Sequence, residues 1–243
     1  MLKEILDVDI DELDILSEDI KNMKVIIKND KNIEHYRDIS SKKPLDYQKN
    51  RWNSNKQMYS GIKMSEKIID YKSINSWIDI GCGTGNFFEY ILPKYKNIKN
   101  ITCVDAVKEF TEITSDKINK LNSNVNIRKI HSPIHDINIT EKFNLVTLSG
   151  VLQVLDLDKI YETFDMLTSL VSENGQLWIN TANYNFKDVE KRRSGGIYRF
   201  KPKELELLLK KYNFSIIDSK TYDMDSNISK DIESEFVYLY GKK

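Results

Sequence analysis

The amino-acid sequence predicts an α/β fold with a mostly parallel sheet and helices on both faces. Short apolar runs alternate with helical patterns from residue 76 onward, which is typical of a parallel sheet covered on both sides. A glycine-rich turn follows the first apolar run, where a strand must turn sharply into a helix. The last two runs are joined only by a polar loop from Thr221 to Ser234, so we expect them to form an antiparallel pair.

Seven apolar runs of strand length follow one another along the chain, and helical patterns separate most of them. The last helical pattern has Pro202 near its first turn and Asn213 just past its end, positions that these residues favour. The predicted strands are Ser76–Ile80, Asn100–Val104, Val125–Ile130, Phe143–Ser149, Gln176–Thr181, Phe214–Ser219 and Glu235–Tyr240. The predicted helices are Lys56–Tyr71, Asn86–Leu92, Val107–Leu121, Leu157–Val171 and Lys203–Tyr212.

The first thirty residues form a separate helical pattern. Apolar residues from Leu6 to Ile27 recur at spacings of three or four, and acidic residues crowd the first half. We expect a helix that docks on the rest of the chain, with a homodimer through this helix as the alternative. The predicted division is therefore a helical cap over residues 1–75 and an α/β domain over residues 76–243.

Composition limits the classes of function. Lysine plus arginine and aspartate plus glutamate both number 37, so the chain lacks the basic excess of a protein that grips DNA. No apolar run approaches the ~20 residues that span a bilayer, and no secretory signal is recognisable. The two cysteines and three histidines do not combine at zinc-site spacing. We expect a cytoplasmic protein without a bound metal, a membrane segment or a DNA partner.

The glycine-rich turn runs from Asp79 to Gly85 and reads Asp-Ile-Gly-Cys-Gly-Thr-Gly. The dinucleotide-binding pattern G-x-G-x-x-G would place its third glycine at Asn86, whereas here that glycine is Gly85. The turn also lacks the lysine of a phosphate-binding P-loop. An acid, Asp79, stands two residues before the first glycine. The spacing therefore argues against a nicotinamide oxidoreductase.

A second acidic residue follows the next predicted strand. Asp105 ends the run Ile-Thr-Cys-Val-Asp, twenty residues after Gly85. A carboxylate at the end of this strand can accept hydrogen bonds from both hydroxyl groups of a ribose. The alternative is that Asp105 only caps the following helix.

These two motifs together resemble class I S-adenosylmethionine-dependent methyltransferases, in which the turn reads (D/E)-x-G-x-G-x-G. The resemblance covers roughly Ser76 to Lys243 and implies the strand order 3-2-1-4-5-7-6, with strand 7 antiparallel. It extends through four later segments, which are Phe143–Ser149, Gly150–Leu155, Leu170–Asn183 and Glu235–Tyr240.

The resemblance also implies S-adenosyl-L-methionine as the cofactor and roles for individual residues. Asp79 and the glycine turn hold the methionine part, and Asp105 holds the ribose. Many members carry an adenine-binding acid near Ser132; here the nearest acid is Asp136, so the adenine contact is left open between these two. The cofactor-binding residues expected in this way are Asp79, Gly81, Cys82, Gly83, Gly85, Asp105, Ala106, Ser132, Pro133 and Ser149.

The acceptor is predicted to be an oxygen or nitrogen atom of a small molecule. The segment after the fourth strand, Ser149 to Leu152, lacks the (D/N/S)-P-P-(Y/F/W) motif of enzymes that methylate DNA amines. Neither cysteine follows a proline, unlike the nucleophile of enzymes that methylate the cytosine ring. The paired-glutamate loop of protein arginine methyltransferases is also missing. RNA or protein acceptors, and a cofactor-binding partner subunit without activity, remain the alternatives.

Two connections are expected to complete the site. Trp52 and Tyr47, just before the predicted helix Lys56–Tyr71, are expected to cover the cofactor and meet the acceptor, although Trp52 packing on the core is an equal alternative. The long connection after the fifth strand begins beside the reaction centre. It carries the predicted acceptor-binding residues Tyr184, Arg193 and Tyr198, and His35 is the candidate for a catalytic base.

Overall fold

The structure is a computed structural model that describes residues 55–155, 159–183, 198–212, 214–222 and 236–243. The helical pattern of the first thirty residues lies outside this part of the chain. The homodimer through that helix and the division at residue 75 therefore stay predictions.

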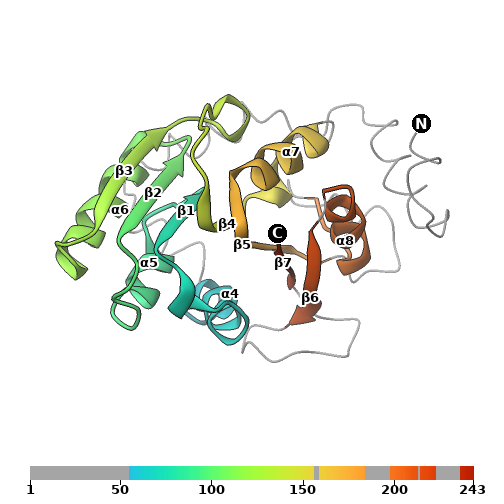
Figure 1. The fold of residues 1–243 in the computed structure, drawn as a ribbon, viewed down its shortest axis with the longest axis horizontal. Helices are drawn as coiled ribbons and strands as arrows, with labels where there is room; N and C mark the ends of the chain where they lie inside the picture. The colour runs from blue at the N-terminus through green and yellow to red at the C-terminus, as the bar shows by residue number, and fades with distance from the viewer. Residues whose placement is uncertain (1–54, 156–158, 184–197, 213, 223–235) are drawn as a thin grey trace.

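A single seven-stranded sheet forms the centre of the molecule, in the order β3-β2-β1-β4-β5-β7-β6 (Figure 1). Neighbouring strands are parallel except at β7, which runs antiparallel to both β5 and β6. This order and the antiparallel pair confirm the predicted sheet. The strands are β1 (Ser76–Ile80), β2 (Asn100–Asp105), β3 (Asn126–His131), β4 (Phe143–Ser149), β5 (Val171–Ala182), β6 (Ser215–Tyr222) and β7 (Phe236–Lys242).

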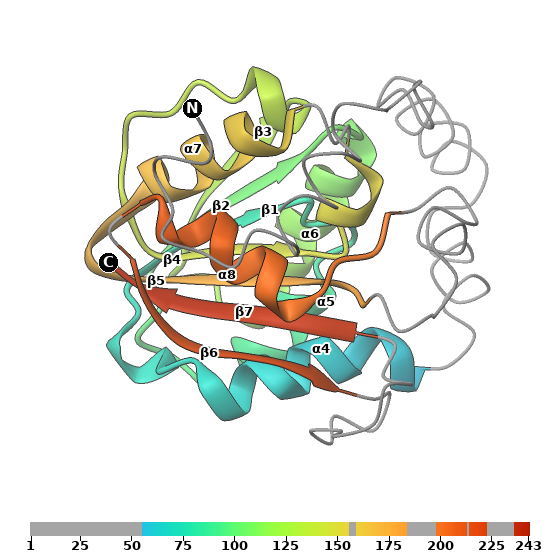
Figure 2. The ribbon, with the colours of Figure 1, turned by 90° about the vertical axis from the view of Figure 1, so that its right-hand side faces the viewer.

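Helices cover both faces of the sheet. α4 (Asn55–Ile68), α5 (Asn86–Ile91) and α6 (Lys108–Leu121) contribute to one buried apolar cluster. α7 (Ile160–Leu170) and α8 (Pro202–Lys210) contribute to a second cluster. Strand residues alternate between the two clusters, because successive side chains of a strand point to opposite faces. Figure 2 shows α4 and α8 on opposite sides of the strands.

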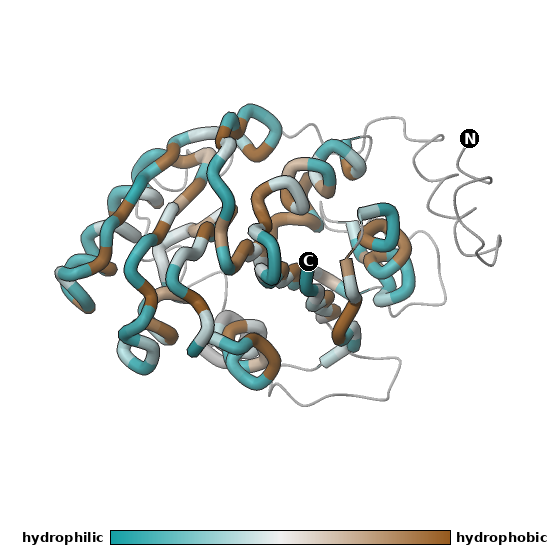
Figure 3. Tube along the Cα trace, in the orientation of Figure 1, coloured by the Kyte–Doolittle hydropathy of each residue, from teal (hydrophilic) through white to brown (hydrophobic). Residues whose placement is uncertain are grey.

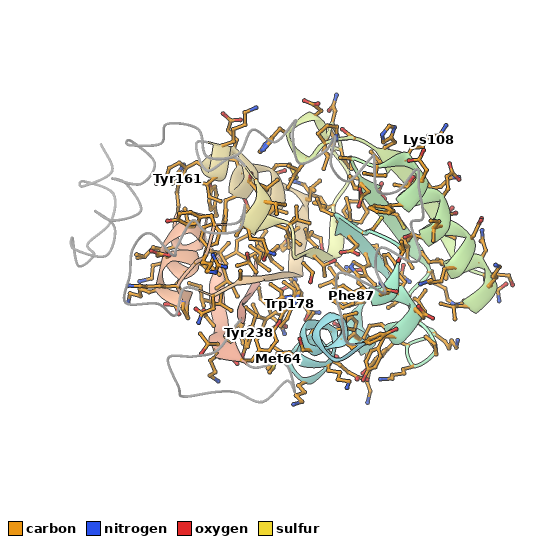
Figure 4. All side chains as sticks on the ribbon, turned by 180° about the vertical axis from the view of Figure 1, so that it is seen from behind. Met64, Phe87, Lys108, Tyr161, Trp178 and Tyr238 are labelled. Atoms are coloured by element: carbon orange, nitrogen blue, oxygen red, sulfur yellow. The ribbon has the colours of Figure 1, made fainter. Side chains whose placement is uncertain are left out.

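The middle strands are apolar enough to be buried on both faces (Figure 3). On the face covered by α4, the Trp178 and Tyr238 rings stack with centroids 5.0 Å apart. Met64 of α4 is fully buried in the same cluster, and Figure 4 shows it near this ring pair. The position of α4 matters for the site, because this helix lies against the residues at the carboxyl ends of β5 and β6.

Several element boundaries differ from the sequence-based ones. α4 ends at Ile68, because the chain turns through a short 3₁₀ helix, η1 (Tyr71–Ser73), that buries Tyr71. β5 begins at Val171, because this residue already pairs with Phe143 before an irregularity in the ladder. Asn174 within that irregularity adopts a φ of 61°. Within the described residues, no helix is both long and apolar enough to cross a bilayer.

Candidate functional site

The glycine-rich turn lies at the carboxyl ends of β1 and β2. Gly81, Gly83 and Gly85 have φ values of 76°, 53° and 77°, a conformation that glycine adopts at little cost. The N–H groups of Gly81 and Cys82 both donate to the carbonyl of Val104, at 2.8 and 3.0 Å. Gly85 immediately precedes α5. The turn is therefore fixed against β2 and leads directly into a helix.

Asp105 ties this turn to the end of β2. One carboxylate oxygen accepts the Gly83 N–H at 2.9 Å, and the other accepts the Val107 N–H at 2.9 Å. Each oxygen keeps further lone-pair capacity for a ligand hydroxyl. Burial raises the pKa of Asp105 to about 6, against the lowering effect of the two N–H groups and of nearby His131. The His131 ring itself hydrogen-bonds the carbonyl of Ala106 at 2.9 Å.

Asp79 lies on the adjacent strand and is only 3% exposed. The Trp77 indole donates to the Thr147 hydroxyl at 2.8 Å, and Thr147 donates to the Asp79 carboxylate at 2.6 Å. Burial is the main cause that raises the pKa of Asp79 to about 7, and the charge of Asp105 adds to it. Among the described residues, no lysine or arginine forms an ion pair with either acid. The two carboxyl groups therefore favour a ligand that carries positive charge.

The end of β3 closes the other side of Asp105. The Ser132 N–H donates to the Asp105 carbonyl at 3.1 Å, and the Ser132 hydroxyl donates to the Pro133 carbonyl at 3.0 Å. Ser132 and Pro133 are half-buried, whereas Asp136 is exposed. Ser132 is thus attached to the strand end that carries Asp105, and Asp136 is not.

On the opposite side of Asp79, the end of β4 meets the end of β5. Ser149 lies opposite Asn180, and the Asn180 side-chain amide donates to the Ser149 hydroxyl at 3.1 Å. The next residue, Gly150, has a φ of 72°, and its N–H donates to the Asn180 carbonyl at 2.9 Å. A Cβ atom added at Gly150 would meet nothing within 4 Å. The chain after β4 therefore borders open space at the carboxyl edge of the sheet.

The structure brings most of the predicted cofactor residues together along this edge. Cys82 is buried there as a free thiol, and its sulfur lies 3.8 Å from the Gly83 carbonyl. Tyr198, predicted to bind the acceptor, is 7% exposed, and its ring packs on Phe200 with centroids 4.8 Å apart. The other predicted residues lie outside the described part of the chain; they are His35, Tyr47, Trp52, Tyr184 and Arg193.

Sequence reasoning missed the buried polar residues that support this edge. Thr147 orients Asp79, Asn180 holds Ser149, and Tyr222 donates to Asn180. Gln153 accepts the Ala182 N–H at 2.8 Å with its side chain. A signal was present, because a polar residue inside an otherwise apolar strand needs a buried hydrogen-bond partner.

A family model described as "Methyltransferase domain" matches residues 46–219, more than half of the chain. The chain belongs to the class I S-adenosylmethionine-dependent methyltransferases. A curated relative, malonyl-[acyl-carrier protein] O-methyltransferase 2 from Ilyobacter polytropus, is 29% identical over 125 residues. This alignment spans 51% of the chain but only 46% of the relative.

Solved methyltransferases share the fold. The N-methyltransferase NodS from Bradyrhizobium japonicum, in complex with S-adenosyl-L-homocysteine, superimposes with a TM-score of 0.65 at 13% identity, over 86% of this chain and 98% of NodS. An S-adenosylmethionine-dependent methyltransferase from Clostridium acetobutylicum gives a TM-score of 0.61 at 20% identity, over 81% and 95% of the two chains. At such identities the likeness concerns the fold alone.

The described residues of this methyltransferase fit the cofactor that its family uses. S-adenosylmethionine carries a cationic sulfonium and an ammonium group, and the site offers two acids, Asp79 and Asp105, that form no ion pair with a described lysine or arginine. The ribose needs acceptors for two hydroxyls, and Asp105 has spare capacity on both carboxylate oxygens. The glycine turn allows a ligand to approach the backbone closely.

Proposed function

We propose that the chain transfers a methyl group from S-adenosylmethionine to an oxygen or nitrogen atom of a small-molecule acceptor. The observation that carries this proposal is the pair of carboxyl groups of buried Asp79 and half-buried Asp105, fixed on either side of the glycine turn. When bound, S-adenosylmethionine supplies a methyl group that is activated by the positive charge of the sulfonium.

Each part of the cofactor has a matching group in this proposal. Asp105 accepts the ribose hydroxyls, with Ala106 beside it, and the turn with Asp79 holds the methionine part. We place the adenine at Ser132 and Pro133 in this proposal, which is supported by the bond of Ser132 to the end of β2 and by the exposed position of Asp136. Transfer removes the positive charge of the sulfonium, so the site contributes mainly by orienting the reactants and excluding water. Trp52 is proposed to cover the cofactor.

An oxygen acceptor that is already anionic suits the described groups. On the β4 and β5 side, Ser149 and Asn180 are neutral hydrogen-bonding groups. Of the two described histidines, His131 ends β3 and His135 lies in the 3₁₀ helix that follows, on the side proposed for the adenine. A carboxylate needs no base to become a nucleophile, and Arg193 in the following connection is a suitable partner for it. A nitrogen acceptor would call for a base, for which His35 remains the candidate.

A second candidate is transfer to an acyl group carried on a protein. The Ilyobacter relative is named for such an acceptor. The chemistry at the methyl group would be the same, and only the surface that receives the carrier would differ. Methylation of a free carboxylic acid but not of its carrier-linked form would reject this candidate.

Cofactor binding tests the proposal directly. S-adenosylhomocysteine is expected to raise the melting temperature of the protein, and NAD at the same concentration is not, because a ligand stabilises only the state that binds it. Asp105→Ala is expected to weaken S-adenosylhomocysteine binding by about 1–3 kcal/mol, since two ribose hydroxyls lose an acceptor. Titration calorimetry measures this change, and an unaltered affinity in the variant would refute the ribose assignment.

The connection over residues 184–197 is proposed to bind the acceptor. Both of its ends are fixed near the carboxyl ends of β4 and β5: Asn183 pairs with Phe200, and the Tyr198 N–H donates to the Gln153 carbonyl at 2.8 Å. These flanking contacts support an acceptor-binding role for the connection, because they lie close to the chain that follows β4.

With an acceptor found by screening carboxylic acids for methyl transfer, Tyr184→Ala and Arg193→Ala are expected to lower kcat/KM for it by about tenfold or more. The affinity for S-adenosylhomocysteine should hold in both variants. Wild-type kinetics in both would move the acceptor site toward the segment around Tyr47.

A further inference from the structure

A chain of hydrogen bonds links side chains from three strands, β6, β5 and β4, at the carboxyl edge of the sheet. The Tyr222 hydroxyl on β6 donates to the Asn180 side-chain oxygen at 2.5 Å, and the Asn180 amide nitrogen donates to the Ser149 hydroxyl at 3.1 Å. Tyr222 is fully buried, and Asn180 is 7% exposed. The side chain of Ser60, on α4, also hydrogen-bonds Tyr222. We call Ser149, Asn180 and Tyr222 the β4–β6 relay.

The direction of these bonds determines what Ser149 offers to a ligand. Because the Ser149 oxygen accepts a hydrogen bond from Asn180, its own hydrogen can be donated elsewhere. No described residue accepts that hydrogen. Ser149 follows Leu148, which pairs with Ile80 just before the glycine turn. The hydroxyl therefore stands as a donor at the carboxyl edge of the sheet, beside the strand that carries Asp79.

Helix α4 holds the relay from the side. Gly61 lies so close that an added Cβ atom would be 2.5 Å from the Asn180 amide nitrogen and 3.0 Å from the Tyr222 hydroxyl. Glycine inside a helix costs about 1 kcal/mol relative to alanine, so its presence is explained by this close approach. Asn180 is thus fixed by α4, by Tyr222 and by its backbone bond to Gly150.

On the function proposed above, the order of groups along the edge would bring the amino-acid end of the cofactor next to the relay. With the adenine at Ser132 and the ribose at Asp105, an extended ligand continues across the glycine turn toward β4. Its ammonium group is attracted to the acids, whereas its carboxylate needs a hydrogen-bond donor. Ser149 is a donor at that position.

Resting on the function proposed above, we propose that Asn180 and Tyr222 are positioning residues that hold the Ser149 hydroxyl as a donor to the carboxylate at the amino-acid end of the cofactor. They act through Ser149 and do not touch the ligand. Ser149 is the residue of the relay that meets it.

Two nucleosides separate this role from general packing. S-adenosylhomocysteine has the amino-acid end, and 5′-methylthioadenosine lacks it but keeps the adenine, ribose and sulfur. Ser149→Ala and Tyr222→Phe are each expected to weaken the binding of S-adenosylhomocysteine about tenfold, which is about 1.4 kcal/mol. Titration calorimetry should show an unchanged affinity for methylthioadenosine. Ser149→Thr, which keeps the hydroxyl, should retain wild-type affinity for both.

Tyr240→Phe is the matched control. Tyr240 is also a buried tyrosine next to β5, and its hydroxyl donates at 2.5 Å to the Gln176 side chain, four residues before Asn180 in that strand. This variant loses an equivalent buried bond and should bind both nucleosides as the wild type does. The double variant Ser149→Ala/Tyr222→Phe should be no weaker than Ser149→Ala, because both changes remove one interaction.

The relay would be overturned, and the proposed function left intact, by either of two results in Ser149→Ala and Tyr222→Phe. One is an equal loss of affinity for both nucleosides, and the other is no loss of affinity for either. A wild-type protein that binds neither nucleoside would overturn the proposed function and the relay with it. Because Ser149→Ala removes only one oxygen from a half-buried residue, it tests the donor even if Tyr222→Phe fails to fold.

Discussion

Gly81→Ala is expected to destabilise the protein by roughly 2–5 kcal/mol, in the range of overpacked and strained sites. Two effects add at this position. The φ of 76° disfavours any side chain, and the new Cβ atom would lie only 2.1 Å from a methyl carbon of Val151. To relieve this close contact, the glycine turn must move away from the chain that follows β4. S-adenosylhomocysteine affinity should therefore fall at least tenfold as well.

Gly150→Ala is the matched control for Gly81→Ala. Gly150 has nearly the same φ, 72°, but an added Cβ atom would meet nothing within 4 Å, so only the backbone penalty of roughly 1–2 kcal/mol applies. Thermal and urea denaturation give the two free energies of unfolding. Adding Val151→Ala to Gly81→Ala should recover part of the loss. Equal destabilisation by the two glycine substitutions would contradict the close contact at Val151.

Asp79→Asn is expected to stabilise the ligand-free protein at pH 8 and to weaken the binding of S-adenosylhomocysteine. The rise in the pKa of Asp79 from 3.8 to about 7 corresponds to about 4 kcal/mol of lost stability above pH 7. The sign follows from proton binding. Between pH 4 and pH 7 the folded protein holds a proton that the unfolded chain has released, so stability falls as the pH rises through this range.

Denaturation of the ligand-free protein between pH 4 and pH 8 measures this effect. The wild-type free energy of unfolding should decline with pH, and Asp79→Asn should remove most of the decline above pH 6. Asp105, with its pKa raised to about 6, accounts for the remainder at lower pH. Asp116→Asn changes an exposed carboxylate on α6 and should leave the pH dependence unaltered. If the free energy of unfolding of Asp79→Asn declined with pH as steeply as that of the wild type, a group other than Asp79 would be the cause of the decline.

Local patterns were sufficient for most of the fold. β1 and β4 coincide with the predicted ranges residue for residue, because each is a mostly apolar run of strand length next to polar residues or glycine. β5 was predicted to begin at Gln176, since Asn174 and Gly175 are typical turn residues. The structure instead includes them in an irregular part of the strand, and Val171 pairs beyond it. Pairing with a partner strand decided this boundary, and a single-strand pattern does not contain that information.

The candidate site divides in the same way. The glycine turn, Asp79 and Asp105 were predictable because their chemistry lies within one short stretch and at the end of the next strand. The buried polar residues that hydrogen-bond to this site could not be predicted from the sequence. Thr147 bonds Asp79 from 68 residues away, and Tyr222 bonds Asn180 from 42 residues away. Only the strand order brings these residues together, and the order came from resemblance to a family.

The place of β7 between β5 and β6 also governs when the sheet can be completed. During synthesis β5 is complete at Ala182, long before residues 236–242 emerge, and among the described strands β7 is the one that pairs with β6. Until β7 pairs with it, β5 keeps an unpaired edge that includes Trp178, and such an edge can pair with another chain. Folding is therefore expected to finish late, through contacts between distant parts of the chain, which form slowly. The nascent protein is most exposed to aggregation in the interval before β7 inserts.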